Sequence, residues 1–320
     1  MKEKILITGT TGLIGSNLVD YILKKHYEDY EIYATKLPRT EPYLPEYVKY
    51  YDCDFTDFYS CLNLIDDLKP EYIVHLGAQS YPKIGESNPF MTVDSNINGN
   101  LNILEAVRKA KYMPKSIVVA CSSASYGDVK GKYPTSEDTA FNPLSLYGVT
   151  KATQDLMCYQ YFKNFDLPIK RIRPYIIVGR NQGENNAINS FSKQIATIEK
   201  NGGKGVIKVG NLSSYRDITD VRDAVRGIWK LMFEGVNGEA YNICSGNPRK
   251  MKDILNQLIE LSEADIKVEV EESRLRPSDI PLEHGSNHKI NTLTGWIPEI
   301  PFKDTLESIL DYWREKIGKN

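Results

Sequence analysis

Tyr147 and Lys151 have the side chains and the spacing of an acid/base pair. On a helix, residues four positions apart share a face, so the phenol and the ammonium would lie together. A free tyrosine has a pKa of about 10, and using it as a base near neutral pH means favouring its anion by roughly 3 units, or ~4 kcal/mol. A nearby lysine charge supplies part of this free energy. The alternative is an ordinary helix with the tyrosine at the edge of a core and the lysine in water.

The hydroxyl-rich segment from Ala120 to Gly127 supplies partners for this pair. It ends an expected buried strand, so its hydroxyls should emerge where ligands bind, and the following loop is long enough to return Tyr147 there. With a dinucleotide bound, we expect hydride transfer at a carbon that bears oxygen. Ser122 would hold that oxygen, Tyr147 would pass its proton, and Lys151 would bind the nicotinamide ribose. A nucleophilic serine is disfavoured, because the chain has neither a G-x-S-x-G elbow nor a plausible histidine base.

A glycine-rich turn near the N-terminus is the candidate dinucleotide site. The apolar run from Ile5 to Thr8 is typical of a strand buried on both faces, and the segment from Leu13 to Leu23 has the period of a helix. The glycines between them, spaced GxxGxxG and not GxGxxG, would let the backbone approach a pyrophosphate bound by the first N–H groups of the helix. The residues that we expect at the cofactor here are Gly9, Thr11, Gly12, Leu13, Ile14 and Gly15.

The end of the second expected strand, Glu31 to Thr35, bears on the choice of cofactor. NAD sites carry an acidic side chain at this position, to bind the adenosine ribose, and none stands here. The chain has Lys36 and Arg39 instead, which would suit the 2′-phosphate of NADP. We therefore favour NADP(H) and leave NAD(H) open, since the two cations are also compatible with a solvated loop.

Strand and helix patterns alternate along the first 178 residues. This alternation predicts an α/β fold, with a Rossmann-like, doubly wound parallel sheet and a smaller C-terminal α/β substrate lobe. We expect the dinucleotide-binding domain to span 1–178 plus about 212–236, and the nucleotide-sugar-binding lobe to span about 179–211 and 237–320. The strands are expected at 5–8, 31–35, 51–55, 72–79, 116–122 and 169–177, and the helices at 13–23, 59–68, 96–109 and 146–162.

The composition limits the classes of partner. The 40 basic and 42 acidic side chains give a net charge of −2, so no general field attracts nucleic acid or an anionic membrane. The five cysteines and four histidines show no metal-ligand spacing, which predicts reduced thiols and no structural metal. Strand-like residues begin at Ile5, and no apolar run reaches the ~18 residues of a membrane span. We expect a cytoplasmic protein without a signal peptide.

Further motifs accompany these residues. The set comprises Thr8 to Gly15, Asp54 and Phe55, His75 to Gln79, Asn96 with Gly99, Ser122 to Gly127, and Tyr147 with Lys151. It resembles the extended short-chain dehydrogenase/reductase family over nearly the whole chain. The resemblance implies a nucleotide-sugar substrate, catalysis by Ser122, Tyr147 and Lys151, and a homodimer, with a tetramer left open. It also implies further cofactor contacts from Asp54, Phe55, Leu76, Gly77, Ala78, Gln79 and Tyr175.

The second half of the chain is similar to the GDP-sugar branch of that family. The similar segments are 208–217, 241–246, 275–279 and 294–296. They imply reduction at C4 of a GDP-4-keto-6-deoxy-mannose-type sugar, with Arg216 and Arg276 on the diphosphate. Guanidinium groups suit phosphate oxygens, which agrees with that role. The substrate-binding residues implied are Ser123, Ala124, Asn185, Lys193, Val209, Arg216, Arg276 and Asp279.

This chain departs from the family pattern at two positions. One disfavours a reaction of the family, and the other admits a further substrate. Dehydratases carry a glutamate where this chain has Ala124, and an alanine does no acid/base work. Ile176 stands where the family often has an asparagine, which leaves the sugar contacts open and admits a GDP-heptose. The alternatives are therefore a C4 dehydrogenase, a C4 epimerase with retained NAD, a less favoured GDP-mannose 4,6-dehydratase, and a dinucleotide-binding regulator without chemistry.

Overall fold

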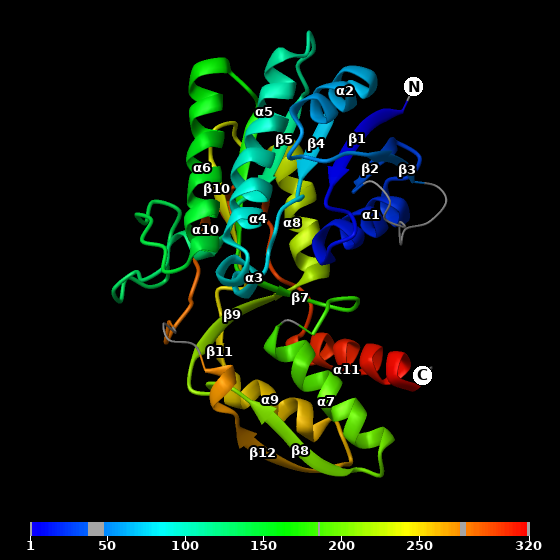
Figure 1. Cartoon of the computed structure of the whole chain (residues 1–320), viewed down its shortest axis with the longest axis vertical. Helices are drawn as coiled ribbons and strands as arrows, with labels where there is room; N and C mark the ends of the chain where they lie inside the picture. The colour runs from blue at the N-terminus through cyan, green and yellow to red at the C-terminus, as the bar shows by residue number, and fades with distance from the viewer. Residues whose placement is uncertain (1, 38–47, 185, 276–279, 319–320) are drawn as a thin grey trace.

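A seven-stranded parallel sheet forms the larger part of the molecule (Figure 1). The structure is a computed structural model and describes residues 2–37, 48–184, 186–275 and 280–318. The strand order is β10-β6-β5-β4-β1-β2-β3, and every neighbouring pair is parallel. The strands span Glu3–Thr8 (β1), Tyr30–Lys36 (β2), Lys49–Asp52 (β3), Tyr72–His75 (β4), Ser116–Ala120 (β5), Ile169–Pro174 (β6) and Ala240–Ile243 (β10).

Helices cover both faces of this sheet, which is why its central strands are continuous apolar runs. On one face pack α1 (Leu13–Lys25), α8 (Val221–Glu234) and α10 (His288–Thr294). On the other face pack α2 (Phe58–Leu68), α5 (Gly99–Lys109) and α6 (Leu146–Phe165). The Rossmann-like, doubly wound sheet expected from the sequence is confirmed. No helix among the described residues is both long and apolar enough to cross a membrane.

The smaller lobe has its own core, beneath the sheet in Figure 1. Helices α7, α9 and α11 pack there against two short sheets, of order β11-β9-β7 and β12-β8. The helices span Ala187–Lys200 (α7), Met251–Glu260 (α9) and Phe302–Gly318 (α11). The strands span Ile176–Val178 (β7), Lys204–Val209 (β8), Tyr215–Asp220 (β9), Pro248–Lys250 (β11) and Asp265–Val270 (β12).

Two features of the chain path differ from the expectation. The strand expected at 169–177 divides into β6, in the large sheet, and β7, in the lobe. Pro174 ends β6, and proline has no N–H with which to continue a ladder. In addition, the domain bounds differ from those expected. β10 joins the large sheet beside β6 and α10 packs against α8, although 237–320 was expected in the lobe, and β9 pairs in the lobe, although about 212–236 was expected in the dinucleotide-binding domain. The chain therefore returns to the large domain after 237.

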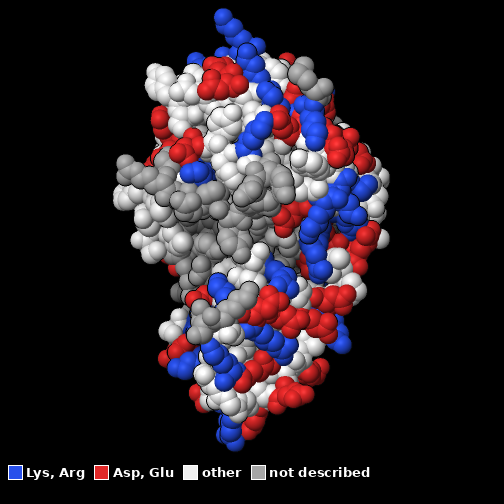
Figure 2. All heavy atoms as spheres, turned by 90° about the vertical axis from the view of Figure 1, so that its right-hand side faces the viewer, with Lys and Arg blue, Asp and Glu red and all other residues white. Residues whose placement is uncertain are grey.

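Charged side chains of both signs are mixed on the face that Figure 2 shows. Lysine and arginine lie next to aspartate and glutamate over both parts of the molecule, as expected for a chain with 40 basic and 42 acidic residues. Many described lysine and arginine side chains form ion pairs with aspartate or glutamate, for example Arg180 with Glu315 at 2.8 Å. That face therefore carries no large field of a single sign.

Candidate active site

The carboxyl ends of β1, β4 and β5 lie side by side and form the floor of the site. Because β4 is the only strand between β1 and β5, the residues that follow β1 and β5 are two strand spacings, or about 10 Å, apart. The buried His75 at the end of β4 shares a hydrogen bond with Thr8 of β1, with 3.0 Å between Nδ1 and Oγ1. The same hydroxyl accepts hydrogen bonds from the N–H groups of Leu76 (3.0 Å) and Gly77 (2.8 Å). This network fixes the start of both loops.

The glycine turn between β1 and α1 is closely packed where it meets β4. Gly9 has φ +69°, and a Cβ there would lie 2.8 Å from the N atom of Gly77. A Cβ on Gly15 would lie 2.4 Å from the oxygen of Gly9. Gly12 is the N-cap of α1, and no side chain makes a capping hydrogen bond there. The N–H of Gly12 donates to the carbonyl of Gly9 at 3.0 Å, so the donors that would suit a dinucleotide pyrophosphate are the N–H groups of the first turn of α1, which the closely packed glycines leave accessible to a ligand.

The end of β2 lies against this turn. Thr10 is fully buried, and its hydroxyl donates to the carbonyl of Thr35 at 3.1 Å. The next residue, Lys36, is bonded to Asp52 at 2.8 Å in an ion pair between β2 and β3. Lys36 therefore lies beside the glycine turn, but its ammonium has a carboxylate partner in this state. Arg39, the other candidate for a 2′-phosphate, lies outside the described residues.

The further cofactor contacts expected from the family resemblance lie in the loops after β3 and β4. The Phe55 ring packs edge-on against His75 and covers Gly77, while the Asp54 carboxylate accepts from the N–H and hydroxyl of Thr56 at 2.9 and 2.7 Å. Farther along, the buried amide of Asn96 bonds the backbone N–H and carbonyl of Gln79 and also reaches Thr150 of α6. This amide connects the loop that contains Leu76, Gly77, Ala78 and Gln79 to α6.

Tyr147, Lys151 and Ser122 converge at the start of α6. Ser145 caps this helix by accepting from the N–H of Gly148 at 3.1 Å, and Tyr147 and Lys151 follow within its first two turns. Ser122, which follows β5 closely, lies near enough to the side chain of Tyr147 to lower its pKa, and its hydroxyl accepts from the N–H of Ala124 at 3.1 Å. A Cβ on Gly148 would lie 2.7 Å from the carbonyl oxygen of Ala124, so only glycine lets the helix approach this loop so closely.

Burial governs the titration of both groups. It raises the pKa of Tyr147, an effect that the side chain of Ser122 opposes. It lowers the pKa of Lys151 to about 8. Tyr147 is 9% and Lys151 3% exposed. At neutral pH the phenol therefore keeps its proton while the lysine is mainly an ammonium, a combination suited to proton donation to a carbonyl oxygen.

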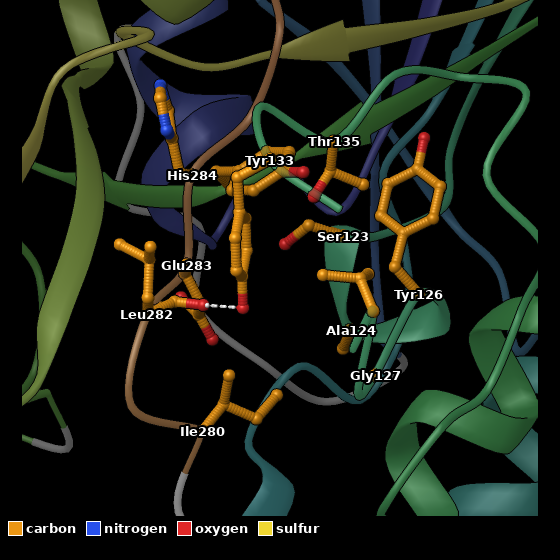
Figure 3. Close-up of a pocket in the computed structure, with 12 residues that line it drawn as sticks. Ser123, Ala124, Tyr126, Gly127, Tyr133, Thr135, Ile280, Leu282, Glu283 and His284 are labelled. Atoms are coloured by element: carbon orange, nitrogen blue, oxygen red, sulfur yellow. Dashed lines mark hydrogen bonds between the residues drawn. The ribbon is translucent and has the colours of Figure 1, made fainter. Parts of the chain in front are cut away.

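A small cavity of about 30 Å³ opens beside Ser123 and Ala124 (Figure 3). The opposite wall of the cavity is formed by residues of the 280–284 segment. The phenol of Tyr133 donates to the Leu282 carbonyl of this segment at 2.8 Å. Three residues expected from the sequence, Ser123, Ala124 and Tyr175, line this cavity. The sequence missed Tyr133, Thr135 and the 280–284 segment, because no local pattern reveals a contact between segments so far apart.

The expected substrate residues of the lobe are not all at one surface. Arg216 donates to the carbonyls of Tyr215 (2.8 Å) and Ile280 (2.7 Å), so its guanidinium is fixed at the cavity wall. Lys193 of α7 pairs with Glu184 at 2.7 Å and lines a separate groove of about 300 Å³, together with Arg274. The side chain of Val209 is buried in the lobe core. Asn185, Arg276 and Asp279 lie outside the described residues.

A buried ion-pair network, which no local sequence pattern predicted, joins α6 to β6. The carboxylate of Asp155 on α6 accepts from Arg173 at 2.8 and 2.9 Å and from Arg171 at 2.5 Å, both on β6. Arg173 also donates to the Tyr126 hydroxyl at 2.9 Å, and Tyr126 donates to Asn242 at 2.8 Å. This network joins α6 to the sheet. Among the residues that the structure describes, no cluster of His, Cys, Asp and Glu is arranged to hold a metal.

The parallel sheet, the glycine turn and the convergence of Ser122, Tyr147 and Lys151 define an extended short-chain dehydrogenase/reductase. The family model described as GDP-mannose 4,6 dehydratase matches residues 6–309. The chain belongs to that family and is an enzyme.

One relative and two solved structures are similar to this chain. The chain is 26% identical over 318 residues to the GDP-6-deoxy-D-mannose reductase of Pseudomonas aeruginosa, covering 99% of each chain. Its structure is similar to that of RMD from Pseudomonas aeruginosa complexed with NADPH, at 24% identity and TM-score 0.85, covering 98% of this chain and 100% of the other. It is also similar to UDP-glucuronic acid 4-epimerase from Bacillus cereus in complex with UDP-glucuronic acid and NAD, at 25% identity and TM-score 0.85, covering 98% and 99%.

Proposed function

We propose that this enzyme transfers hydride at C4 of a GDP-linked sugar, and that its reaction is reduction of a GDP-4-keto-6-deoxy-mannose-type substrate. The observation that carries the proposal is that the buried side chains of Ser122, Tyr147 and Lys151 come together where α6 begins, beside the glycine turn between β1 and α1. The similarity to a GDP-6-deoxy-D-mannose reductase along 99% of both chains supports this substrate class.

Each residue has one role in the proposed reaction. The nicotinamide, when bound, supplies the hydride. Ser122 donates a hydrogen bond to the C4 carbonyl oxygen and so stabilises the charge that develops on it. Tyr147 gives its phenolic proton to that oxygen, and the ammonium of Lys151 stabilises the phenolate that remains. Solvent then returns a proton to Tyr147, so the phenol is restored for the next turnover.

The proposed cofactor is NADPH. Lys36 stands at the end of β2, where an NAD site would carry an acid, and its ammonium would suit a 2′-phosphate if the phosphate displaced Asp52. The relative RMD has been solved as its NADPH complex, which supports the same preference.

Dehydration is the less favoured reaction within the family. It needs an acid/base group near C5 and C6, and the residue at that position is Ala124, which lines the cavity next to Ser123. The methyl group of alanine neither accepts nor donates a proton. Membership in a family described as a dehydratase therefore does not carry that activity to this chain.

A C4 epimerase that keeps its NAD bound is the second candidate. The likeness to UDP-glucuronic acid 4-epimerase, at 25% identity over 98% of this chain, favours it. An epimerase and a reductase use the same Ser, Tyr and Lys chemistry, and they differ in whether the ketone turns over between two hydride deliveries. The residues of the site therefore do not distinguish the two enzymes. Net oxidation of the cofactor, which a reductase shows and an epimerase does not, distinguishes them.

The test is to incubate the purified protein with the GDP-4-keto-6-deoxy sugar and NADPH or NADH, and to follow cofactor oxidation and the product by NMR. We expect stoichiometric oxidation of NADPH, faster than that of NADH. GDP-mannose without added cofactor is the control. Its conversion to the 4-keto sugar would contradict the proposal in favour of a dehydratase. Interconversion of C4 epimers without net cofactor oxidation would favour the epimerase.

A further inference from the structure

Two acceptors inside the protein hold the ammonium of Lys151. Its Nζ donates to the carbonyl of Ala120, at the end of β5, at 2.9 Å, and to Oε1 of Gln154 at 2.8 Å. Lys151 and Gln154 lie three positions apart on α6 and therefore share one face of the helix. An ammonium has three N–H donors, so these two contacts leave one donor for a further acceptor.

The orientation of the Gln154 amide is fixed from its other end. Its Nε2 donates to Oδ1 of Asn100 at 3.2 Å, and Asn100 is fully buried on α5. The thiol of Cys158 lies 3.9 Å from the same oxygen. Since Nε2 is used on Asn100, the oxygen of the same amide must face Lys151. Gln154 is itself 1% exposed, so water does not compete for this contact.

The acceptor that Gln154 presents is a neutral amide oxygen, so it leaves the positive charge of the Lys151 ammonium uncancelled. The titratable groups around the ammonium are Cys121 after β5, Cys158 on α6 and His75 on β4, besides Tyr147 itself. Burial and the Lys151 charge together lower the pKa of His75 to about 3, so that ring is uncharged. The nearest carboxylate on the helix, Asp155, is bound to Arg171 and Arg173. A carboxylate in the place of Gln154 would partly cancel the positive charge that a phenolate at Tyr147 requires.

We propose that Gln154 is a positioning residue of the active site: with Asn100 behind it, it fixes the Lys151 ammonium beside Tyr147 without neutralising its charge. The inference rests on the proposed function, because it assigns Gln154 a part in the same proton transfer. It assigns no chemical step to Gln154, which acts through Lys151.

The first test measures kcat against pH in two variants of this one side chain. Gln154→Met keeps the volume and removes the acceptor, so the ammonium loses its proton more readily and the high-pH limb should move down by roughly one unit. Gln154→Glu keeps the shape and adds a charge, so that limb should move up. Gln160→Met, at an exposed position of the same helix, is the control and should match the wild type. Activity lost equally at every pH, with the limb unmoved in both variants, would overturn the inference.

The second test does not need turnover. An NMR titration of ¹³Cε-labelled lysine, with the Lys151 signal assigned by its loss in Lys151→Met, reports the midpoint of Lys151 directly. We expect midpoints in the order Gln154→Met, wild type, Gln154→Glu. Identical midpoints overturn the role of Gln154 even if the enzyme reduces the sugar. Ordered midpoints in a protein that turns over no GDP sugar support Gln154 and reject the proposed reaction. If the methionine variant does not fold, the glutamate variant still shows whether a change at position 154 raises the Lys151 midpoint, as the inference requires.

Discussion

Burial shifts the pKa values of Tyr147 and Lys151 in opposite directions. It raises that of the phenol and lowers that of the ammonium to about 8. The spacing of the two residues predicted that they share a helix face, and they do. It did not reveal that burial favours the protonated phenol, nor that Ser122 is the group that opposes this effect. The site as folded is therefore arranged for a phenol that donates a proton.

Replacement of Tyr147 by phenylalanine tests its role as the proton donor. The variant keeps the ring, so packing and cofactor binding should persist, while kcat should fall about 10²- to 10⁴-fold because the donor is gone. Steady-state kinetics and NADPH fluorescence measure the two quantities on one sample. A variant with intact turnover would exclude Tyr147 as the donor, and one that no longer binds NADPH would point to a structural role.

The pH dependence of reduction should follow Lys151. Its ammonium is present below its pKa and lost above it, so kcat should decline as the pH rises through about 8. The phenol does not set this limb, because burial raises its pKa. Rates in a constant-ionic-strength buffer series would show the decline. A profile that stays flat up to about pH 10, the ordinary pKa of tyrosine, would contradict the assignment.

At the scale of elements, the glycine turn joins β1 to α1 with no space for a side chain. In Gly15→Ala the new Cβ would lie 2.4 Å from the Gly9 oxygen and 2.8 Å from the Thr10 Cα, so backbone must move. We expect a loss of about 1–3 kcal/mol in stability and weaker NADPH binding. Thermal unfolding with and without NADPH measures both effects. Gly318→Ala, with open space around it, is the control and should change neither.

The ion-pair network of Asp155 joins α6 to β6. Burial raises the pKa of this carboxyl, but Arg173 and Arg171 outweigh burial and hold it below its usual value. The pair therefore adds stability above the ordinary pKa of aspartate, and this contribution is lost as the pH falls through the lowered value.

In Asp155→Ala two buried guanidinium groups lose their partner, so we expect a loss of about 3–5 kcal/mol in the free energy of unfolding at neutral pH. Urea denaturation measures it. Asp166→Asn, at the exposed left-handed end of the same helix, is the matched control and should stay near the wild type. An Asp155→Ala protein as stable as the control would show that the network contributes little.

Local patterns predicted the elements that carry their own signal. The buried run of β1, the glycine turn and α6 lie within a few residues of their expected positions, because periodicity and turn residues are local properties. The partner of β6 was not predictable in this way. β10 comes from a distant part of the chain, and four residues give too short an apolar run to assign to a sheet. The cavity wall at 280–284 and the contact of Gln154 with Asn100 likewise depend on tertiary packing.

At the scale of the whole molecule, the sheet and the lobe are connected at Asp217 of β9. Its buried carboxylate accepts from the N–H and hydroxyl of Ser245 at 2.7 and 2.6 Å, and from the N–H groups of Gly246 and Gly285 at 3.0 and 3.1 Å. Ser245 and Gly246 follow β10 of the large sheet, and Gly285 follows the 280–284 segment that lines the cavity. Asp217 therefore connects strand β9 of the lobe to both of these segments. The neighbouring Arg216 donates to the carbonyl of Ile280, a residue that lines the cavity.

Arg216 belongs to the lobe and the glycine turn to the large domain. We therefore expect that variants at these two places weaken the binding of different ligands. Arg216→Lys keeps the positive charge but loses the two-pronged guanidinium, so KM for the GDP sugar should rise about 10-fold while the Kd of NADPH stays unchanged. Gly15→Ala should show the reverse order of effects. Initial-rate kinetics and NADPH titration of both variants test the prediction. Equal losses of both ligands in Arg216→Lys would mean that the two parts do not bind separately.

The most direct test of the central claim is to follow the hydride itself. NADPH carrying deuterium at C4 of the nicotinamide is incubated with the protein and the GDP-4-keto-6-deoxy sugar, and the product is examined by NMR. We predict one deuterium at C4 of the sugar with the wild type, and the same label formed about 10²- to 10⁴-fold more slowly with Tyr147→Phe. Deuterium at another carbon, or a product whose C4 hydrogen comes from solvent, would contradict reduction at C4 by Ser122, Tyr147 and Lys151.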